Sequence, residues 1–205
     1  MNPRRINLLY RFIRITGHLC FRSIYRLEVE GREHIPATGP GIILPKHQFW
    51  TDIPIVGLAV WQPLNFIAKQ ELFVYPGVKH FLSFLGGVPI DRLNPLKSRD
   101  SFRYVEQLLQ NGEWIVLFPE GTYYPHTMGR GKYRFIQRLL GFQEKMGWHG
   151  DRAIPFVPMG IHYDEKRLRT EVQVKIGRPL YAKGETEGQE FTRRILKEIA
   201  GLSGF

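Results

Sequence analysis

The chain has 205 residues, 43% of them hydrophobic, and it carries a formal net charge of +10. A chain of this length most simply forms one domain that can bury a hydrophobic core, and the composition excludes a disordered chain. The positive charge indicates a polyanionic partner, which is nucleic acid, an anionic membrane surface or a phosphorylated substrate. The single cysteine, Cys20, excludes an intramolecular disulfide and a cysteine-based metal cage.

The N-terminal segment predicts a helix that lies on a membrane surface without crossing it. Its arginines interrupt every apolar run well before the roughly 18 residues that a membrane span needs. Read at helical spacing, one basic stripe lies beside a wide apolar face, as in helices at anionic membranes. The stripe consists of Arg4, Asn7, Arg11, Arg14, His18, Arg22 and Arg26. We expect residues 1–25 to associate with the membrane; an ordinary docking helix is the alternative.

Beyond Gly31, short β-type runs alternate with helical ones, which predicts an α/β fold. We expect one domain over 26–205, with a central mixed, mostly parallel sheet flanked by helices. The expected strands are 26–30, 41–44, 64–68, 88–91, 114–118, 154–161 and 172–176. The clearest helices are expected at 96–109 and 190–200, and a further one after His47.

Residues 45–52, PKHQFWTD, join a predicted buried strand to a predicted helix. A lone histidine beside apolar residues is most often structural. Five residues turn a helix by about 500°, so His47 and Asp52 cannot share a helical face. His47 is therefore expected in the loop and Asp52 in or near the first helical turn, where its carboxylate can bond one imidazole nitrogen. Such a bond leaves the other nitrogen free as a general base.

No serine or cysteine nucleophile in an elbow motif lies near His47, so the base is expected to act directly on a substrate hydroxyl. A second dense segment, VLFPEGTYYP at 116–125, places Glu120 and Gly121 in a turn after a β-forming run. Arg92 ends the segment GGVPIDR, and Lys69 follows another predicted strand. Taken singly, such turns and surface charges are common.

Together and in this order, these segments resemble the phospholipid-synthesis acyltransferase family, the lysophosphatidate and glycerol-phosphate acyltransferases that share a His-x4-Asp motif. Its four motifs are similar to residues 47–52, 87–92, 118–122 and 154–161. The connecting segments LEVEGREHIP, AKQELFVYPGVKHFLSFLGG and VKIGRPL are similar as well, so the resemblance covers nearly all of 27–181.

The resemblance implies acyl transfer from an acyl thioester to the hydroxyl of a lysophosphatidate-type acceptor in phospholipid biosynthesis. The co-substrate is acyl-coenzyme A or acyl carrier protein, with no other cofactor, no metal and no covalent intermediate. His47 is implied as the general base and Asp52 as its orienting partner. The implied substrate-binding residues are Lys69, Arg92, Glu120, Gly121, Thr122 and Pro158. Backbone amides near Gly121 are candidates for the oxyanion donor.

The resemblance also implies an enzyme on the cytoplasmic face of a membrane, peripheral or monotopic. Its expected partners are the anionic membrane surface, a lysophospholipid acceptor and the acyl-coenzyme A or acyl carrier protein donor, but no nucleic acid. Two positions depart from the family pattern: Lys46 stands where Asn is frequent, and Tyr123 stands where Arg is usual. A phenol supplies one neutral hydrogen bond where a guanidinium supplies a charged, bidentate one. The nearby basic residues Arg130, Lys132 and Arg134 either compensate for the missing arginine charge at position 123 or contact the membrane.

Three other functions stay open at this point. An acyltransferase could use another lysolipid acceptor. A basic nucleic-acid-binding module accounts for the charge but not for the histidine motif, and salt-dependent nucleic-acid binding without turnover would indicate it. A thioester or phospholipid hydrolase would use His47 to activate water, and product analysis with and without acceptor separates it from a transferase.

Overall fold

The computed structural model describes residues 25–74, 86–90, 99–166 and 170–205, together with the single positions 77, 79 and 82. The predicted N-terminal membrane helix, except for Tyr25, and the predicted substrate residue Arg92 lie outside the described residues.

The described strands form one seven-stranded sheet in the order β1-β7-β6-β2-β5-β3-β4. They are β1 (Tyr25–Glu30), β2 (Gly41–Pro45), β3 (Leu64–Lys69), β4 (Gly87–Ile90), β5 (Trp114–Val116), β6 (Phe156–Glu165) and β7 (Thr170–Ile176). All paired strands run parallel except β6 and β7, which are antiparallel. The predicted mixed, mostly parallel α/β sheet is confirmed.

The described helices include one that the sequence pattern did not predict. They are α2 (Asp52–Ala59), α4 (Arg99–Gln110), α5 (Tyr133–Lys145) and α6 (Gly188–Ser203), with short 3₁₀ turns η1 (Arg32–His34), η2 (Gln70–Phe73), η3 (Gly150–Arg152) and η4 (Glu185–Glu187). The unpredicted helix is α5, whose start was interpreted only as a basic cluster. Its signal was present, because Ile136, Leu139 and Leu140 recur at helical spacing and are buried.

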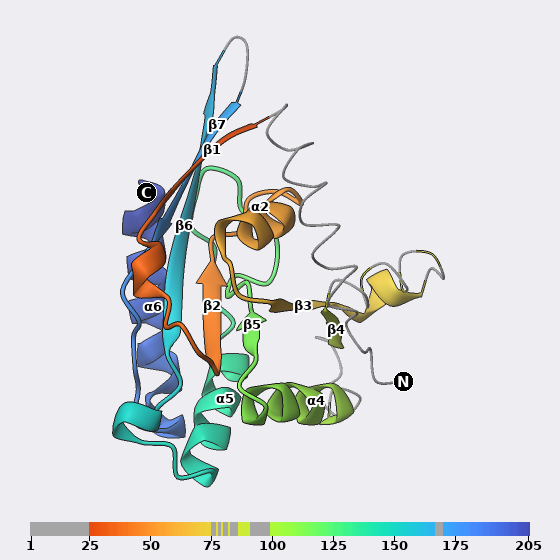
Figure 1. The fold of residues 1–205 in the computed structure, drawn as a ribbon, viewed down its shortest axis with the longest axis vertical. Helices are drawn as coiled ribbons and strands as arrows, with labels where there is room; N and C mark the ends of the chain where they lie inside the picture. Colours follow the sequence, from red (N-terminus) through yellow and green to blue (C-terminus); the bar gives the residue numbers. More distant parts are fainter. Residues whose placement is uncertain are drawn as a thin grey trace.

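Two apolar clusters cover the two faces of the sheet. Side chains of neighbouring strand residues alternate between the faces, so Ile42 packs with α4, α5 and α6, whereas Ile43 packs with α2. Every residue of β2 is buried, as expected of a central strand with helices on both sides. Figure 1 shows β2 in the middle of the sheet, with its arrowhead pointing toward α2.

The parallel strands place several loops at one edge of the sheet. β2, β3, β4 and β5 are mutually parallel neighbours, so the chain leaves each of them at the same edge. Binding crevices of open α/β sheets lie outside this carboxyl edge. His47 follows β2 there, and Glu120 follows β5. The topology therefore brings the first and third sequence motifs together.

Candidate active site

The loop before α2 is shaped by the carboxylate of Asp52. Asp52 is the first residue of α2 and is fully buried. Its Oδ2 accepts hydrogen bonds from the backbone N–H groups of Gln48 at 2.5 Å and Phe49 at 2.8 Å. The residue thus folds the chain before it back over the helix N-terminus, where a negative charge is also favourable.

His47 lies in this loop, as the five-residue spacing predicts. Its Nδ1 is 3.1 Å from Oδ2 of Asp52. A carboxylate only accepts, so Nδ1 carries the proton and Nε2 is the basic nitrogen. The imidazole stacks on Phe118, with ring centroids 3.8 Å apart, and meets the edge of Tyr123 at 4.4 Å. The ring therefore has a fixed tautomer and a fixed plane.

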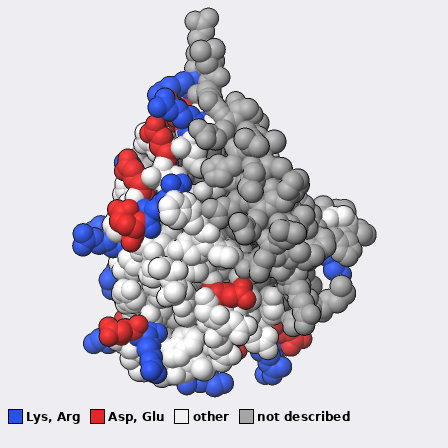
Figure 2. Space-filling model, viewed as in Figure 1, with Lys and Arg blue, Asp and Glu red and all other residues white. Residues whose placement is uncertain are grey.

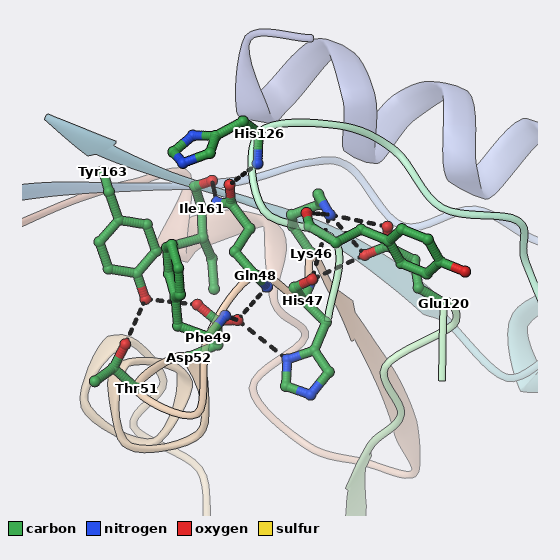
Figure 3. A network of polar contacts seen from close by, with 11 residues as sticks. Lys46, His47, Gln48, Phe49, Thr51, Asp52, Glu120, His126, Ile161 and Tyr163 are labelled. Carbon is green, nitrogen blue, oxygen red and sulfur yellow. Dashed lines mark hydrogen bonds and ion pairs between the residues drawn. The ribbon is translucent and has the colours of Figure 1, made fainter. Parts of the chain in front are cut away.

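The second imidazole nitrogen is the accessible one. Figure 3 shows it pointing away from Asp52. Within the described ranges, no side chain or backbone group forms a hydrogen bond with Nε2, and 8% of the His47 surface is exposed. An imidazole held in this way can accept a proton from a bound hydroxyl.

The other oxygen of Asp52 is held by a tyrosine from β6. The hydroxyl of Tyr163 donates to Oδ1 at 2.5 Å, and Thr51 Oγ1 lies 3.0 Å from the same hydroxyl. Burial raises the pKa of the Tyr163 phenol above its usual range, and the charge of Asp52 raises it further. Tyr163 is therefore a neutral donor, and Asp52 accepts four hydrogen bonds.

On the other side of His47 lies a buried ion pair that the sequence did not predict. Lys46 and Glu120 have fully buried side chains, and Nζ of Lys46 lies 2.8 and 2.9 Å from the two oxygens of Glu120. Burial lowers the pKa of the Lys46 ammonium, and its hydrogen bond and charge interaction with Glu120 oppose that shift. Nζ also donates to the carbonyl of Tyr124 at 2.8 Å. These contacts satisfy the buried cation.

Glu120 was predicted to bind substrate. In the structure its carboxylate accepts hydrogen bonds from protein donors. Besides Lys46, its oxygens accept from the backbone N–H of His47 at 2.9 Å and of Gly129 at 2.6 Å. The amide of Gly121, a candidate oxyanion donor, donates to the carbonyl of Phe118 at 3.1 Å. Glu120 therefore holds the loop 46–51, which we call the histidine loop, and the Gly121 amide closes the turn that carries Glu120.

The segment 119–132 is fastened to the histidine loop at several points. The N–H of Tyr124 donates to the carbonyl of His47 at 2.9 Å, and the N–H of His126 donates to the side chain of Gln48 at 3.2 Å. Figure 3 shows Glu120 and His126 of this segment in contact with residues 46–48. The third motif is thus a cover over the first one, and we call the segment 119–132 the cover loop.

Two side chains of the cover loop reach the rim of the site. Tyr123, at the usual arginine position, is half exposed, and desolvation together with the charge of Asp52 raises the pKa of its phenol. Lys132 runs along Gly121, where an added Cβ would lie 2.8 Å from its Cδ and 3.2 Å from its Nζ. Gly121 has φ 73°, which favours glycine. A lysine amine therefore stands beside the motif turn.

The remaining predicted site residues take different places. Lys69 is exposed at the end of β3 and is paired in register with Ile90, the last residue of β4. Thr122 is exposed on the cover loop. Pro158 is buried and lies against Gly177.

The position of Pro158 in β6 separates it from the imidazole. Its strand neighbours Val157 and Met159 belong to the apolar cluster under α2, which also contains Phe118, the ring that stacks on His47. Strand side chains alternate, so Pro158 faces the opposite side of the sheet. Among the described residues, no three His, Cys, Asp or Glu side chains gather in a metal-binding arrangement.

Sequence reasoning missed Lys46 and Tyr163 as parts of this site. Lys46 carried a signal, because a lysine directly after a fully apolar strand needs a buried acid, and Glu120 follows the neighbouring strand. Tyr163 gave no sequence signal for a role in the site. It lies more than a hundred residues from Asp52 in the sequence, and no motif marks it.

Comparison with known proteins identifies the family of the chain. The family model described as Acyltransferase matches residues 26–161. The chain belongs to the acyltransferase family. Its matched range begins in β1 and ends within β6, so it contains both the His47–Asp52 pair and the Lys46–Glu120 pair.

Curated relatives of this acyltransferase chain include several with defined acceptors. A 1-acyl-sn-glycerol-3-phosphate acyltransferase of Pseudomonas aeruginosa is 36% identical over 167 residues, covering 78% of this chain and 61% of that protein. The chloroplastic 1-acyl-sn-glycerol-3-phosphate acyltransferase LPAT1 of Arabidopsis thaliana is 28% identical, covering 59% of this chain and 34% of that protein. A lyso-ornithine lipid O-acyltransferase of P. aeruginosa is 26% identical, covering 72% and 51%. The chain thus spans a third to three fifths of these relatives.

A solved structure has a similar fold. The crystal structure of the 1-acyl-sn-glycerophosphate (LPA) acyltransferase PlsC from Thermotoga maritima superimposes with a TM-score of 0.67 at 27% sequence identity, covering 95% of this chain and 78% of that chain.

Proposed function

We propose that the protein transfers a fatty acyl group from an acyl thioester to the free hydroxyl of a lysophosphatidate-type acceptor. The observation that carries the proposal is the geometry of His47, whose Nδ1 is bound to a buried carboxylate while Nε2 has no hydrogen-bond partner among the described residues. Relatives that transfer acyl groups to 1-acyl-sn-glycerol-3-phosphate support the choice of acceptor.

In this mechanism Nε2 of His47 takes the hydroxyl proton as the acceptor oxygen attacks the thioester carbonyl. The resulting tetrahedral oxyanion collapses, the carbon–sulfur bond breaks, and the thiol leaves with a proton returned by the imidazolium. Asp52 stabilises that imidazolium and keeps the tautomer. Because the attack is direct, the enzyme needs no covalent acyl intermediate.

Acceptor recognition is assigned to three cationic side chains. Arg92, Lys69 and Lys132 are the proposed phosphate-binding residues, because charged donors bind phosphate oxygens more strongly than neutral ones. Lys132 supplies, beside the turn at Gly121, a positive charge that Tyr123 lacks. Glu120 and Gly121 act indirectly, by holding the cover loop.

The test is product analysis with purified protein. Acyl-coenzyme A and acyl carrier protein thioesters are supplied with lysophosphatidate, and thiol release is compared with phosphatidate formed. We expect thiol and phosphatidate in equal amounts and little release without acceptor. Release of free fatty acid at the same rate without acceptor would show a hydrolase instead, and nucleic-acid binding without any turnover would show a binding module.

A second acceptor class is favoured by Tyr123. Its phenol stands at the usual arginine position and 4.4 Å from the imidazole, and one relative acts on a lyso-ornithine lipid. The same assay with a lyso-ornithine lipid and with a lysophosphodiester measures this alternative. A kcat/KM higher for either of them than for lysophosphatidate would replace the proposed acceptor.

A further inference from the structure

The Tyr163 hydroxyl is a buried polar group that the proposed reaction does not use directly. It donates to Asp52 Oδ1 at 2.5 Å, while Oδ2 of the same carboxylate bonds the imidazole at 3.1 Å. Figure 3 shows the chain of contacts from Thr51 through Tyr163 and Asp52 to His47. Its members come from the N-terminal end of α2, from β6 and from the histidine loop.

The tyrosine is held firmly in this place. Its ring meets the ring of Phe49 edge to face, with centroids 5.1 Å apart and planes at 88°. It lies on β6, whose residue Asp164 continues the antiparallel pairing with β7. A donor on a strand fixes the rotation of the carboxylate from the side opposite to the backbone donors of Gln48 and Phe49.

A donor on Asp52 also controls how strongly the carboxylate attracts the imidazole. Each hydrogen bond to a carboxylate spreads its negative charge and weakens it as an acceptor for its other partners. With four donors, Asp52 stabilises the imidazolium less than a bare carboxylate would. An imidazole that stayed protonated could not act as the base near neutral pH.

We propose that Tyr163 is a positioning residue that orients Asp52 and moderates the basicity of His47 through it. The inference rests on the proposed function of His47 as the general base. The other titratable groups around the pair are Lys46, Glu120 and Tyr123, and Tyr25 stands beside Tyr163. Lys46 and Glu120 compensate each other, so Tyr163 is the donor whose removal changes the Asp52 environment most simply.

The experiment compares two single-group deletions. Tyr163→Phe removes the donor to Asp52 and keeps the ring against Phe49. Thr51→Val removes the other partner of the same hydroxyl and leaves the bond to Asp52. For each full-length protein, kcat/KM is measured against pH, and the His47 ring protons are titrated by NMR without substrate.

We expect Tyr163→Phe to move the acid limb of kcat/KM and the NMR midpoint upward by about half a pH unit or more, which corresponds to one moderate hydrogen bond. Thr51→Val should leave both within about 0.2 units of wild type, since it does not touch the carboxylate. Replacing Tyr163 by 3-fluorotyrosine, a stronger donor of similar shape, should move both downward.

Midpoints equal to wild type in Tyr163→Phe and in the fluorotyrosine protein would overturn the inference and leave Tyr163 a packing residue. An equal shift in Thr51→Val would do the same. If Tyr163→Phe does not fold, the fluorotyrosine protein decides alone. If wild type transfers no acyl group, the proposed function fails, but the NMR titration still tests the link between Tyr163 and His47.

Discussion

Two buried carboxylates lie on either side of His47 and have different tasks. Asp52 bonds the imidazole at Nδ1, whereas Glu120 bonds the backbone N–H of the same residue and the ammonium of Lys46. One carboxylate therefore controls the side chain of the base, and the other controls where its backbone stands. Substitutions at the two positions should consequently fail in different ways.

Replacing Asp52 by Asn should lower kcat by about 10²-fold or more. A carboxamide has one acceptor oxygen for four donors, so the imidazole loses its fixed tautomer or its orientation. The measurement is kcat with saturating acceptor, and Asp151→Asn, which changes an exposed carboxylate in the same way, is the control. Equal kcat in Asp52→Asn and wild type would show that the contact does not serve the reaction.

Replacing Arg92 by Ala should raise the acceptor KM about tenfold or more while changing the donor KM little, because one charged hydrogen bond is lost. Tyr123→Arg should preserve or improve use of lysophosphatidate. Both variants are measured on lysophosphatidate, a lysophosphodiester and a phosphate-free alcohol. If Arg92→Ala affects all three acceptors equally, Arg92 does not bind the phosphate.

At the level of elements, the cover loop and the histidine loop form one unit. Lys46 bonds both the Glu120 carboxylate and the Tyr124 carbonyl, so one side chain ties the exit of β2 to the segment after β5. The family's frequent Asn at this position is neutral. In this chain the buried ammonium of Lys46 therefore needs an acidic partner, which is Glu120.

Replacing Lys46 by Met should lower the free energy of unfolding by roughly 3 to 5 kcal/mol, because it leaves Glu120 buried without its cation. The double variant Lys46→Met/Glu120→Gln should lose less than the sum of the single losses. Urea denaturation measures all three, with exposed Lys183→Met as the control. Strict additivity would show that the pair makes no joint contribution.

Sequence patterns were sufficient for the strands and for the first motif. All seven expected strands are present with ends shifted by a few residues, because alternation and apolar runs report burial directly. The His47–Asp52 contact followed from a five-residue spacing. The helix α5 was not predicted, because the basic residues near its start were interpreted as a surface cluster although its apolar residues recur at helical spacing.

The long-range contacts of the site could not be predicted in the same way. The bonds of Glu120 to Lys46 and of Tyr163 to Asp52 join residues 74 and 111 positions apart, and only the strand order brings them together. A sequence pattern identifies which residues are polar at a strand end but not which of them meet. The protein partners of Glu120, which was predicted to bind substrate, therefore could not be predicted from its motif.

For the whole molecule, the distribution of charge matters more than its total. On the face in Figure 2, most described lysines and arginines lie toward the margin, several of them near acidic side chains, and an acidic side chain also lies among the uncharged residues nearer the middle. Residues 1–24 contain five arginines and no acidic residue, which is half of the formal net charge of +10. Helices of the described ranges are too short or too polar to span a bilayer. Because five arginines stand in residues 1–24 without an acidic residue, we propose them as the source of membrane attraction.

Replacing these five arginines by Gln should weaken binding to anionic vesicles severalfold or more at low salt, since each basic residue near such a surface contributes about 1 kcal/mol. They are Arg4, Arg5, Arg11, Arg14 and Arg22. Wild-type binding should fall as salt rises, because ions screen the attraction. Cosedimentation measures both. Unchanged binding of the Gln variant would place the membrane contact elsewhere on the molecule.

The proposed role of His47 is tested most directly by acyl transfer in a folded His47→Ala protein. The rate of phosphatidate formation from lysophosphatidate is measured for this variant and wild type, with the far-ultraviolet circular dichroism of both and with host acyltransferase excluded by a mock preparation. We expect a fall of about 10² to 10⁴ with an unchanged spectrum, because the general base is lost. A well-folded His47→Ala protein that forms phosphatidate at close to the wild-type rate would contradict the mechanism.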